Sequence, residues 1–526
     1  MVINFGTHQT ITTTISSTNG TFSVTFRIDT QPAGTTVVSA RDEDGDYGCE
    51  DFEILSEITK VSPKKGYVGS IVTLEGAGYT QNGSVTIHFG THQSITTTQA
   101  GINGTFSVTF IVSTQTAQTQ IITAFGSLDT DTYYIIPEIT TLNPMQGPVS
   151  QVITLTGTGF GSETVRIDFG TKQTITTSQT NINGTFSVTF VVTDQQAGST
   201  TITAIGLTTS EYDTTVFVII AGNILVTPTS GFVGEIITVQ ASGFTGGNVL
   251  SIQFGTHFTI TTTTVKPSGT FSATFVISTQ PFGPKEIIAR DQTGNQGSGW
   301  ATILYHITRI QPATDTVGTD VTIEGSGFDG VSIISIYFGT KATITTTIAS
   351  TNGTFSAVFK VNTQQEGSKV VSVTDSAGHF STTLFTIIAK ITELIPTSEP
   401  AGKPVTIAGT GYRQNETIRI DFGIPVTIAT TIASANGTFS VTFTTIAQSI
   451  GSTVITAQGL DSSQIATTVF VIKAEISSIS PLSGIVGSEV TVKGTGFNSI
   501  EEIHISFGSH KTITTTVTSC AFHSHH

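Results

Sequence analysis

The stretch Phe106-Ser-Val-Thr-Phe-Ile-Val112 begins with a strict alternation of apolar and polar side chains. Alternation with a period of two predicts a β-strand that buries one of its faces. The turn dipeptide Asn103-Gly104 precedes this stretch, and a second alternating stretch, Ser94-Ile-Thr-Thr-Thr98, precedes the turn. Asn-Gly between two such stretches is a strong signal for a β-hairpin with a type I′ turn.

The same pattern extends in both directions to about 80 residues. Between residues 58 and 137, seven short alternating stretches are separated by turn signals every 8–12 residues. They are rich in Val, Ile, Thr and Phe, which suit a pleated, half-buried surface, and none has helical periodicity. The seven predicted strands are 58–63, 72–79, 85–90, 94–98, 106–112, 120–124 and 132–136. This pattern predicts an antiparallel β-sandwich.

Three sequence markers repeat along the whole chain in a fixed order. The first is Phe-Gly after a β-rich stretch, with spacings of 84, 80, 85, 84, 84 and 85 residues. The others are a proline followed by glycines and a Gly-Thr-Phe-Ser run. The Phe-Gly marker lies at Phe5, Phe89, Phe169, Phe254, Phe338, Phe422 and Phe507. The sequence therefore predicts an all-β tandem array with a repeat of about 84 residues, in which Phe89, Phe106 and their counterparts are core aromatics.

The markers place five complete units between two partial ones. A partial unit with only the later strands spans 1–57, a partial unit with only the first strands spans 475–516, and a tail spans 517–526. The complete units are 58–137, 138–222, 223–306, 307–390 and 391–474.

The run Gly318-Thr-Asp-Val-Thr-Ile-Glu-Gly-Ser-Gly-Phe328, followed by Ile336-Tyr-Phe-Gly339, resembles the IPT/TIG family of immunoglobulin-like domains. The same pattern recurs at 58–79 with 87–90 and at 487–497 with 505–508. The resemblance covers essentially the whole chain and implies immunoglobulin-like sandwiches. Domains of this family occur in receptor ectodomains, transcription factors and bacterial surface proteins. The Thr-rich tandem form is similar to repetitive bacterial or archaeal surface and matrix proteins, but fold alone does not fix function.

The strands that the first partial unit lacks are those that the last partial unit carries. Two interpretations stay open: the chain is a piece of a longer array, or the last partial unit of one molecule completes the first partial unit of the next. Strand addition would cover the exposed edges and core. Because the Phe-Gly…Thr-Thr-Thr strands occur in both partial units, one copy would have to be displaced or left outside.

Composition excludes several classes of protein. Charged residues make up 11% of the chain, against roughly 25% in typical soluble proteins, and the net charge is −15. Without clustered Lys and Arg, we expect no nucleic-acid partner. No apolar stretch is long enough for a membrane-spanning helix. Met1-Val2-Ile3-Asn4 does not read as a secretory signal, so either the signal was removed or the sequence is a fragment.

Two features of the partial units are candidate sites. Asp42, Asp44 and Asp46 alternate around a turn glycine, which suits Ca²⁺, although a solvated polar turn explains the same residues. Cys49 and Cys520, which are the two cysteines of the chain, lie in the two partial units. They are either unrelated thiols or an intermolecular disulfide formed in an oxidising compartment. We expect no other cofactor.

Five Asn-Gly-Thr sequences are formal glycosylation sites and also turn signals. Pro267-Ser268-Gly269 replaces the motif in one unit, which keeps a turn and loses the sequon, so we favour the turn. The five asparagines are Asn19, Asn103, Asn183, Asn352 and Asn436. Thr clusters such as 96–98 are either O-glycan acceptors or ordinary strand residues. The position after Phe-Gly-Thr varies between His, Lys and Pro, so we expect it to face solvent. The terminal 523–526 stretch is either a weak metal binder or a tail.

No catalytic constellation is present in the sequence, so we predict that the protein is not an enzyme. The predicted function is an extracellular structural rod in a surface layer, matrix or fibre, with copies of itself as a partner. One alternative is an adhesin that binds cell-surface glycans or proteins through loops, of which 42–51 and 294–300 stand out. The other is a spacer within a larger enzyme or surface protein.

Overall fold

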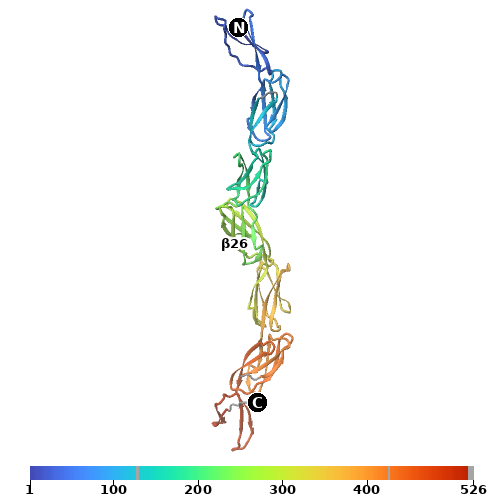
Figure 1. The fold of residues 1–526 in the computed structure, drawn as a ribbon. Helices are drawn as coiled ribbons and strands as arrows, with labels where there is room; N and C mark the ends of the chain where they lie inside the picture. The colour runs from blue at the N-terminus through green and yellow to red at the C-terminus, as the bar shows by residue number, and fades with distance from the viewer. Residues whose placement is uncertain (126–128, 424–426, 519–526) are drawn as a thin grey trace.

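The computed structural model describes residues 1–125, 129–423 and 427–518. Over these ranges the regular structure is β-strand, which confirms the all-β prediction. The described part of the chain contains no helix with the length and apolarity needed to cross a membrane. The repeats follow one another as separate bodies in an elongated array, with the two partial units at opposite ends (Figure 1).

Unit 1 is a sandwich of a three-stranded and a five-stranded sheet. Its strands are β5 (Glu57–Ser62), β6 (Lys65–Gly66), β7 (Ile71–Ala77), β8 (Ser84–Phe89), β9 (His92–Gln99), β10 (Phe106–Ile111), β11 (Gln118–Phe125) and β12 (Thr130–Ile135). The sheet orders are β10-β7-β5 and β6-β12-β11-β8-β9. In the first sheet, Phe106 lies opposite Gly76 and Phe110 opposite Val72.

Units 2 to 5 repeat these two sheets with the same strand order. Unit 2 contains β13 (Glu138–Asn143), β14 (Gln146–Gly147), β15 (Val152–Thr158), β16 (Thr164–Phe169), β17 (Lys172–Gln179), β18 (Phe186–Val191), β19 (Gly198–Gly206) and β20 (Tyr212–Ile219). Unit 3 contains β21 (Leu225–Thr227), β22 (Ser230–Phe232), β23 (Ile236–Ala241), β24 (Val249–Phe254), β25 (His257–Thr264), β26 (Phe271–Val276), β27 (Gly283–Asp291) and β28 (Gln296–Leu304).

The last two complete units have the same elements. Unit 4 contains β29 (His306–Gln311), β30 (Thr314–Thr316), β31 (Asp320–Ser326), β32 (Ile333–Phe338), β33 (Lys341–Ile348), β34 (Phe355–Lys360), β35 (Gly367–Thr374) and β36 (Phe380–Ile388). Unit 5 contains β37 (Lys390–Ile395), β38 (Ser398–Pro400), β39 (Pro404–Thr410), β40 (Thr417–Phe422), β41 (Thr427–Ile432), β42 (Phe439–Thr444), β43 (Gly451–Gly459) and β44 (Ile465–Lys473).

Each complete unit has eight strands rather than the seven predicted, and one strand pair is parallel. The first predicted strand is split at its proline: β5 joins the smaller sheet, whereas β6 pairs parallel to β12 in the larger one. Proline has no backbone N–H for a ladder, so the strand ends there. The Ser62-Pro63 peptide bond is cis, as are its counterparts in the other units. The predicted sandwich is confirmed, and the short parallel pair is an addition that the sequence did not predict.

Five separate hydrophobic cores lie inside the five complete units. In unit 1, Phe89 is fully buried and Phe106 is buried, which confirms both as core aromatics. Phe106 packs edge-on against Tyr79 at a ring distance of 4.9 Å, and Phe89 contacts Phe110 at 5.2 Å. Because no core residue is shared, each unit has its own source of stability.

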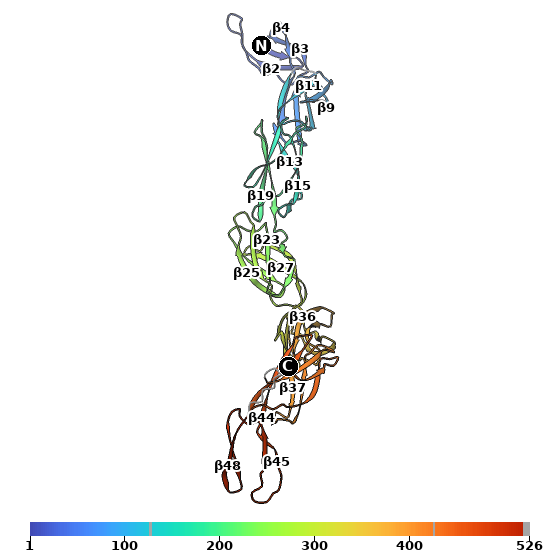
Figure 2. The ribbon, with the colours of Figure 1, turned by 60° about the horizontal axis from the view of Figure 1, so that its bottom comes forward.

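The two partial units contain fewer strands. The N-terminal partial unit has one sheet in the order β2-β1-β3-β4, made of β1 (Val2–Phe5), β2 (His8–Thr13), β3 (Gly34–Arg41) and β4 (Tyr47–Ile54). The C-terminal partial unit has two unconnected hairpins, β45 (Glu475–Ser480) with β46 (Thr491–Thr495) and β47 (Glu502–Phe507) with β48 (His510–Val517). The two hairpins project from the end of the array (Figure 2).

Candidate functional site: the joints between units and the two partial units

A glutamine side chain holds the loop at the far end of every unit. In unit 3, the Gln280 Nε2 donates to the Phe254 carbonyl at 3.2 Å, and its Oε1 accepts from the Thr256 N–H at 3.0 Å. The counterparts Gln31, Gln115, Gln195, Gln364 and Gln448 each donate to the carbonyl of the Phe in the Phe-Gly marker. This contact was not predicted from the sequence, although each Gln follows its Phe by 26 residues and was detectable as a repeat.

The residues after this glutamine form the joint with the next unit. Between units 2 and 3, the Ala197 N–H donates to the Phe244 carbonyl at 3.1 Å. On the other side of the same loop, a Cβ added to Gly269 would lie 2.6 Å from the Gln195 carbonyl oxygen and from the Gln196 Cα. The loop of one unit is therefore enclosed between two loops of its neighbour.

The same joint recurs along the array. The equivalent backbone hydrogen bonds are Ala33 to Tyr79 at 3.2 Å, Ala117 to Phe160 at 2.9 Å and Glu366 to Tyr412 at 3.0 Å. Side chains add to some joints: Arg413 Nε lies 3.1 Å from Glu366 Oε1, and the Tyr134 hydroxyl donates to Glu211. The joint is thus a repeated contact with backbone complementarity, rather than a free linker.

Buried carboxylates connect the loops at the other end of units 2 to 5. Glu163 accepts from the Gly161 N–H at 3.1 Å and the Thr209 N–H at 2.9 Å. Burial opposes ionisation of Glu163, but hydrogen bonds from Thr209, Thr208 and Gly161 outweigh it, so its pKa lies below the ordinary value. Glu416 occupies the same place in unit 5, whereas in units 3 and 4 the carboxylate comes from the opposite loop, as Asp291 and Asp375. Hydrogen bonds from Asn295 and the Thr245 backbone similarly overcome the effect of burial and lower the pKa of Asp291.

We expect the array to lose stability in acid through these carboxylates. Because the folded pKa of Glu163 is lowered, its contribution is fully present above the unfolded pKa and is lost as the pH falls through the folded pKa. Glu163→Gln should lose about 1.5–3 kcal/mol near neutral pH and should flatten the acid side of the profile. Thermal unfolding followed by circular dichroism from about pH 7 to about pH 3 measures this. Identical acid slopes for the two proteins would contradict the assignment.

The N-terminal partial unit exposes positions that are core positions elsewhere. Residues 22–27 correspond to β10 but form no strand, because β7 has no counterpart within this partial unit. Phe22 is 43% exposed, whereas its counterpart Phe106 is 6% exposed. A hollow of about 590 Å³ is lined by Phe22, Val24 and Phe26. In unit 1, β7 pairs with β10, and its Val72 and Leu74 are fully buried.

The C-terminal partial unit exposes the complementary side chains. Val490 is 51% exposed, whereas its counterpart in β7, Val72, is fully buried. In every complete unit, the aromatic residue after β7 or its counterpart packs against the first Phe of the β10 counterpart; these pairs are Tyr79–Phe106, Phe160–Phe186, Phe244–Phe271, Phe328–Phe355 and Tyr412–Phe439. Phe497 and Phe22 are the corresponding residues of the two partial units. Within the described part of the chain, neither has a ring partner.

The predicted calcium residues form a self-contained turn. Asp42 Oδ1 accepts from the Asp44 and Asp46 N–H groups at 3.1 and 2.8 Å. This is the turn that Asp291 and Asp375 make in units 3 and 4. Among the described residues, the carboxylates of Asp42, Asp44 and Asp46 do not form a cluster of three metal-ligand atoms. Calcium binding there stays a prediction.

The Asn-Gly sequences form turns, but not of the predicted type. Gly104 has φ +74°, whereas Asn103 is not among the residues with positive φ. A type I′ turn needs positive φ at both positions, so that prediction was wrong. The Gly104 N–H donates to the Gly101 carbonyl and the Gly101 N–H to the Thr105 carbonyl. The flanking strands β9 and β10 lie in different sheets, so the predicted β-hairpin was also wrong: the turn carries the chain from one sheet to the other. Asn103 is exposed on this turn, and glycosylation at the five asparagines stays a prediction.

The remaining predicted sites are dispersed. Cys49 is an exposed free thiol, whereas Cys520 and the 523–526 stretch lie outside the described residues. The Thr cluster 96–98 lies on β9, an edge strand of its sheet. The position after Phe-Gly-Thr is exposed at His92 and Lys172, as predicted.

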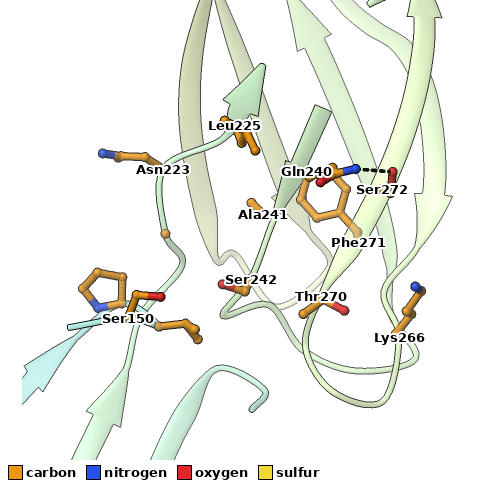
Figure 3. A pocket seen from close by; sticks show the side chains of 13 residues that line it. Ser150, Asn223, Leu225, Gln240, Ala241, Ser242, Lys266, Thr270, Phe271 and Ser272 are labelled. Atoms are coloured by element: carbon orange, nitrogen blue, oxygen red, sulfur yellow. Dashed lines mark hydrogen bonds between the residues drawn. The ribbon is translucent and has the colours of Figure 1, made fainter. Parts of the chain in front are cut away.

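An open hollow of about 670 Å³ lies at the joint between units 2 and 3. Figure 3 shows Ser150 and Asn223 on one side and Gln240, Phe271 and Ser272 on the other. Gln240 Nε2 donates to Ser272 Oγ at 3.5 Å. Lys266 is the charged residue among its described lining residues, so the lining offers no acid–base pair for catalysis.

The fold and joints define a class: a tandem array of immunoglobulin-like sandwiches connected end to end. The sequence model of the IPT/TIG domain family matches residues 306–387 and 474–521. Unit 4 and the C-terminal partial unit thus match the IPT/TIG family to which the sequence showed a resemblance, and units 1, 2, 3 and 5 share the strand order of unit 4. No curated protein matches it.

Several solved structures share the fold at low similarity. An ICAM-5 D1-D4 ectodomain fragment is 12% identical, with 64% of this chain and 99% of that chain covered and a TM-score of 0.19. The bacterial integrin-binding protein invasin is 12% identical, with 65% and 80% covered and a TM-score of 0.18. Bacteroides ovatus SGBP-B, solved in complex with a mixed-linkage heptasaccharide, is 15% identical, with 53% and 83% covered and a TM-score of 0.18. Values this low carry no inference about function.

Proposed function

We propose that the protein is a non-catalytic structural rod of an extracellular surface layer, matrix or fibre, and that it assembles head to tail. The observation that carries the proposal is the match between the two partial units. The N-terminal one has a hollow where a β7 counterpart belongs, and the C-terminal one presents that strand as β46. The repeated joint supports the rod, because it fixes each unit against the next through backbone contacts.

The register of the complete units fixes how the two partial units would pair. Ser107 lies opposite Glu75 in unit 1, and the corresponding residues here are Ser23 and Lys493. Phe22 would then lie opposite Gly494 and would contact Phe497. This arrangement buries apolar surface on both sides and completes both sheet edges.

The hairpin of β47 and β48 stays outside this contact. The N-terminal partial unit already contains the equivalent hairpin of β1 and β2, whose β1 pairs with β3. The donated segment is therefore β45 with β46. The contact joins different surfaces of two copies, so it propagates into a filament unless it closes into a ring. We also propose that Cys49 of one chain and Cys520 of its neighbour form a disulfide at the completed junction.

A disulfide trap tests the pairing. In a Cys49→Ser, Cys520→Ser background, Ser23→Cys with Lys493→Cys places two exposed residues at opposite positions across the proposed strand pair, where Cβ atoms lie about 4.5–5.5 Å apart. We expect a ladder of covalent oligomers on non-reducing gels and long fibres by negative-stain electron microscopy.

The matched control is Ser23→Cys with Glu502→Cys, because β47 stays outside the contact. Ladders from both pairs would indicate random collision, and no ladder from either pair would contradict head-to-tail assembly. Isolated rods at every protein concentration would favour a spacer or an adhesin stalk instead. Binding to a glycan array would then indicate the adhesin rather than the spacer.

A further inference from the structure

Three metal-ligand side chains meet at the end of unit 4 that faces unit 3. Asp329 lies between β31 and β32, and Asp375 and His379 lie in the turn between β35 and β36. One ligand atom from each lies within 4.8 Å of the others, and this is the one such group in the described part of the chain. His379 Nδ1 is 2.7 Å from Asp375 Oδ2 and 3.9 Å from Asp329 Oδ1.

Unit 3 forms the equivalent turn with fewer charged side chains. There Asp291 Oδ1 accepts from the Asn295 N–H at 3.0 Å, and its Oδ2 accepts from the Asn295 side-chain amide at 2.8 Å. The same amide donates to Thr245 Oγ1 at 2.9 Å. One carboxylate and two neutral side chains therefore satisfy the turn.

Unit 4 keeps the carboxylate and replaces both neutral partners. Asp375 stands for Asp291 and accepts from the N–H groups of Ala377 and His379 at 3.0 and 2.9 Å. The N–H of Asp329, which stands where unit 3 has Thr245, donates to the same carboxylate at 3.1 Å. His379 takes the place of Asn295. The substitutions add a second carboxylate and an imidazole beside the first carboxylate, and the turn itself needs neither.

The three side chains are held in place yet reachable. The Asp375 side chain is fully buried, whereas that of Asp329 is 43% exposed. The His379 ring packs against Phe282 of unit 3 at a ring distance of 4.2 Å and against Tyr305 at 4.8 Å. Lys285 of unit 3 interacts electrostatically with Asp329. A cation can therefore enter from solvent beside Asp329 and reach donors that are already fixed.

We propose that Asp329, Asp375 and His379 bind one divalent transition-metal ion, with Zn²⁺ as the best fit to the donors. One imidazole nitrogen and two carboxylate oxygens suit zinc, whereas calcium prefers oxygen ligands alone. In a tetrahedral zinc site with metal–ligand bonds of about 2.0–2.2 Å, the ligand atoms are about 3.3 Å apart. The distance from His379 Nδ1 to Asp375 Oδ2 is shorter than this value, and its distance to Asp329 Oδ1 is longer. Water completes the coordination. Because His379 packs against Phe282, the bound ion also stiffens the joint between units 3 and 4.

The test counts zinc ions bound by the full chain. Asp329→Thr with His379→Asn gives unit 4 the residues with which unit 3 already folds, so this variant removes the site and keeps the turn. We expect metal analysis after equilibration with Zn²⁺ to find one ion fewer per chain than in the parent. The other histidines, including those of the tail, are present in both proteins. Any zinc that they bind therefore contributes equally to both counts.

The reciprocal variant, Thr245→Asp with Asn295→His, transfers the donors to unit 3 and should add one ion per chain. Co²⁺ in place of Zn²⁺ should give tetrahedral absorption bands that are lost in the first variant and increased in the second. Equal zinc counts in the parent and the first variant would overturn the proposal. No added ion in the reciprocal variant would contradict the claim that these three side chains suffice.

Discussion

Phe254→Ala should strongly destabilise unit 3 while the stability of the other complete units stays nearly unchanged. Phe254 is fully buried and contacts Phe275 at a ring distance of 5.2 Å. Truncating a buried Phe to Ala costs about 3–5 kcal/mol, whereas a domain of this size is stable by about 4–12 kcal/mol. The loss is thus a large fraction of the stability of unit 3, and the separate cores confine it to that unit.

The single tryptophan makes this prediction measurable. Trp300 lies on β28 of unit 3, so its fluorescence follows that unit, whereas circular dichroism follows the whole array. We expect Phe254→Ala to move the urea midpoint of the fluorescence transition strongly and to split the circular dichroism transition. Phe338→Ala, the same change in unit 4, is the control and should leave the fluorescence midpoint nearly unchanged. Equal fluorescence shifts in both variants would mean that the array unfolds as one cooperative body.

The units were predictable from the sequence because their determinants are local and repeated. Alternation around Phe106 identifies its strand without knowledge of its partners. The recurrence of Phe-Gly fixes the period, and repetition of an aromatic residue at one phase identifies Phe89 as core. The first prediction rests on a pattern of a few residues, and the other two rest on the recurrence of a short motif from unit to unit.

The joints were not predictable in the same way because they depend on contacts between units. The Ala197 N–H of unit 2 donates to the Phe244 carbonyl of unit 3, and the sequence around either residue gives no sign of this pairing. The unusual donor set of unit 4 is visible as Asp329, Asp375 and His379, but their convergence requires two loops separated by four strands. The type of the Asn-Gly turn was wrong for a related reason, because the conformation of that turn is fitted to a neighbouring unit.

The joints give the array its mechanical character. Only two residues separate β12 from β13, and one residue separates β28 from β29. Between units 1 and 2, the short connection and the hydrogen bond from Ala117 to Phe160 together leave little freedom. An array with stiff joints keeps its two ends in a fixed relative orientation. This property suits a spacer or a fibre subunit better than flexible linkers between the units would.

Gly269→Ala should loosen the joint between units 2 and 3. Gly269 has φ +77°, and its added Cβ would lie 2.6 Å from backbone atoms of Gln195 and Gln196. Those atoms cannot move without shifting unit 2, so the hydrogen bond from Ala197 to Phe244 should break. The left-handed conformation alone costs about 1–2 kcal/mol, and losing the hydrogen bond adds about 0.5–1.5 kcal/mol.

Gly294→Ala separates the two costs within the same unit. Gly294 also has positive φ, at +95°, but nothing lies within 4 Å of its added Cβ. Both variants therefore carry the conformational cost, and only Gly269→Ala disturbs the joint. We expect Gly269→Ala to show the larger shift in Trp300 fluorescence unfolding and a broader distribution of overall dimensions by small-angle X-ray scattering. If both variants scatter like the parent, the contact at Gly269 does not set the stiffness of the joint, and the other contacts between units 2 and 3 would have to supply it.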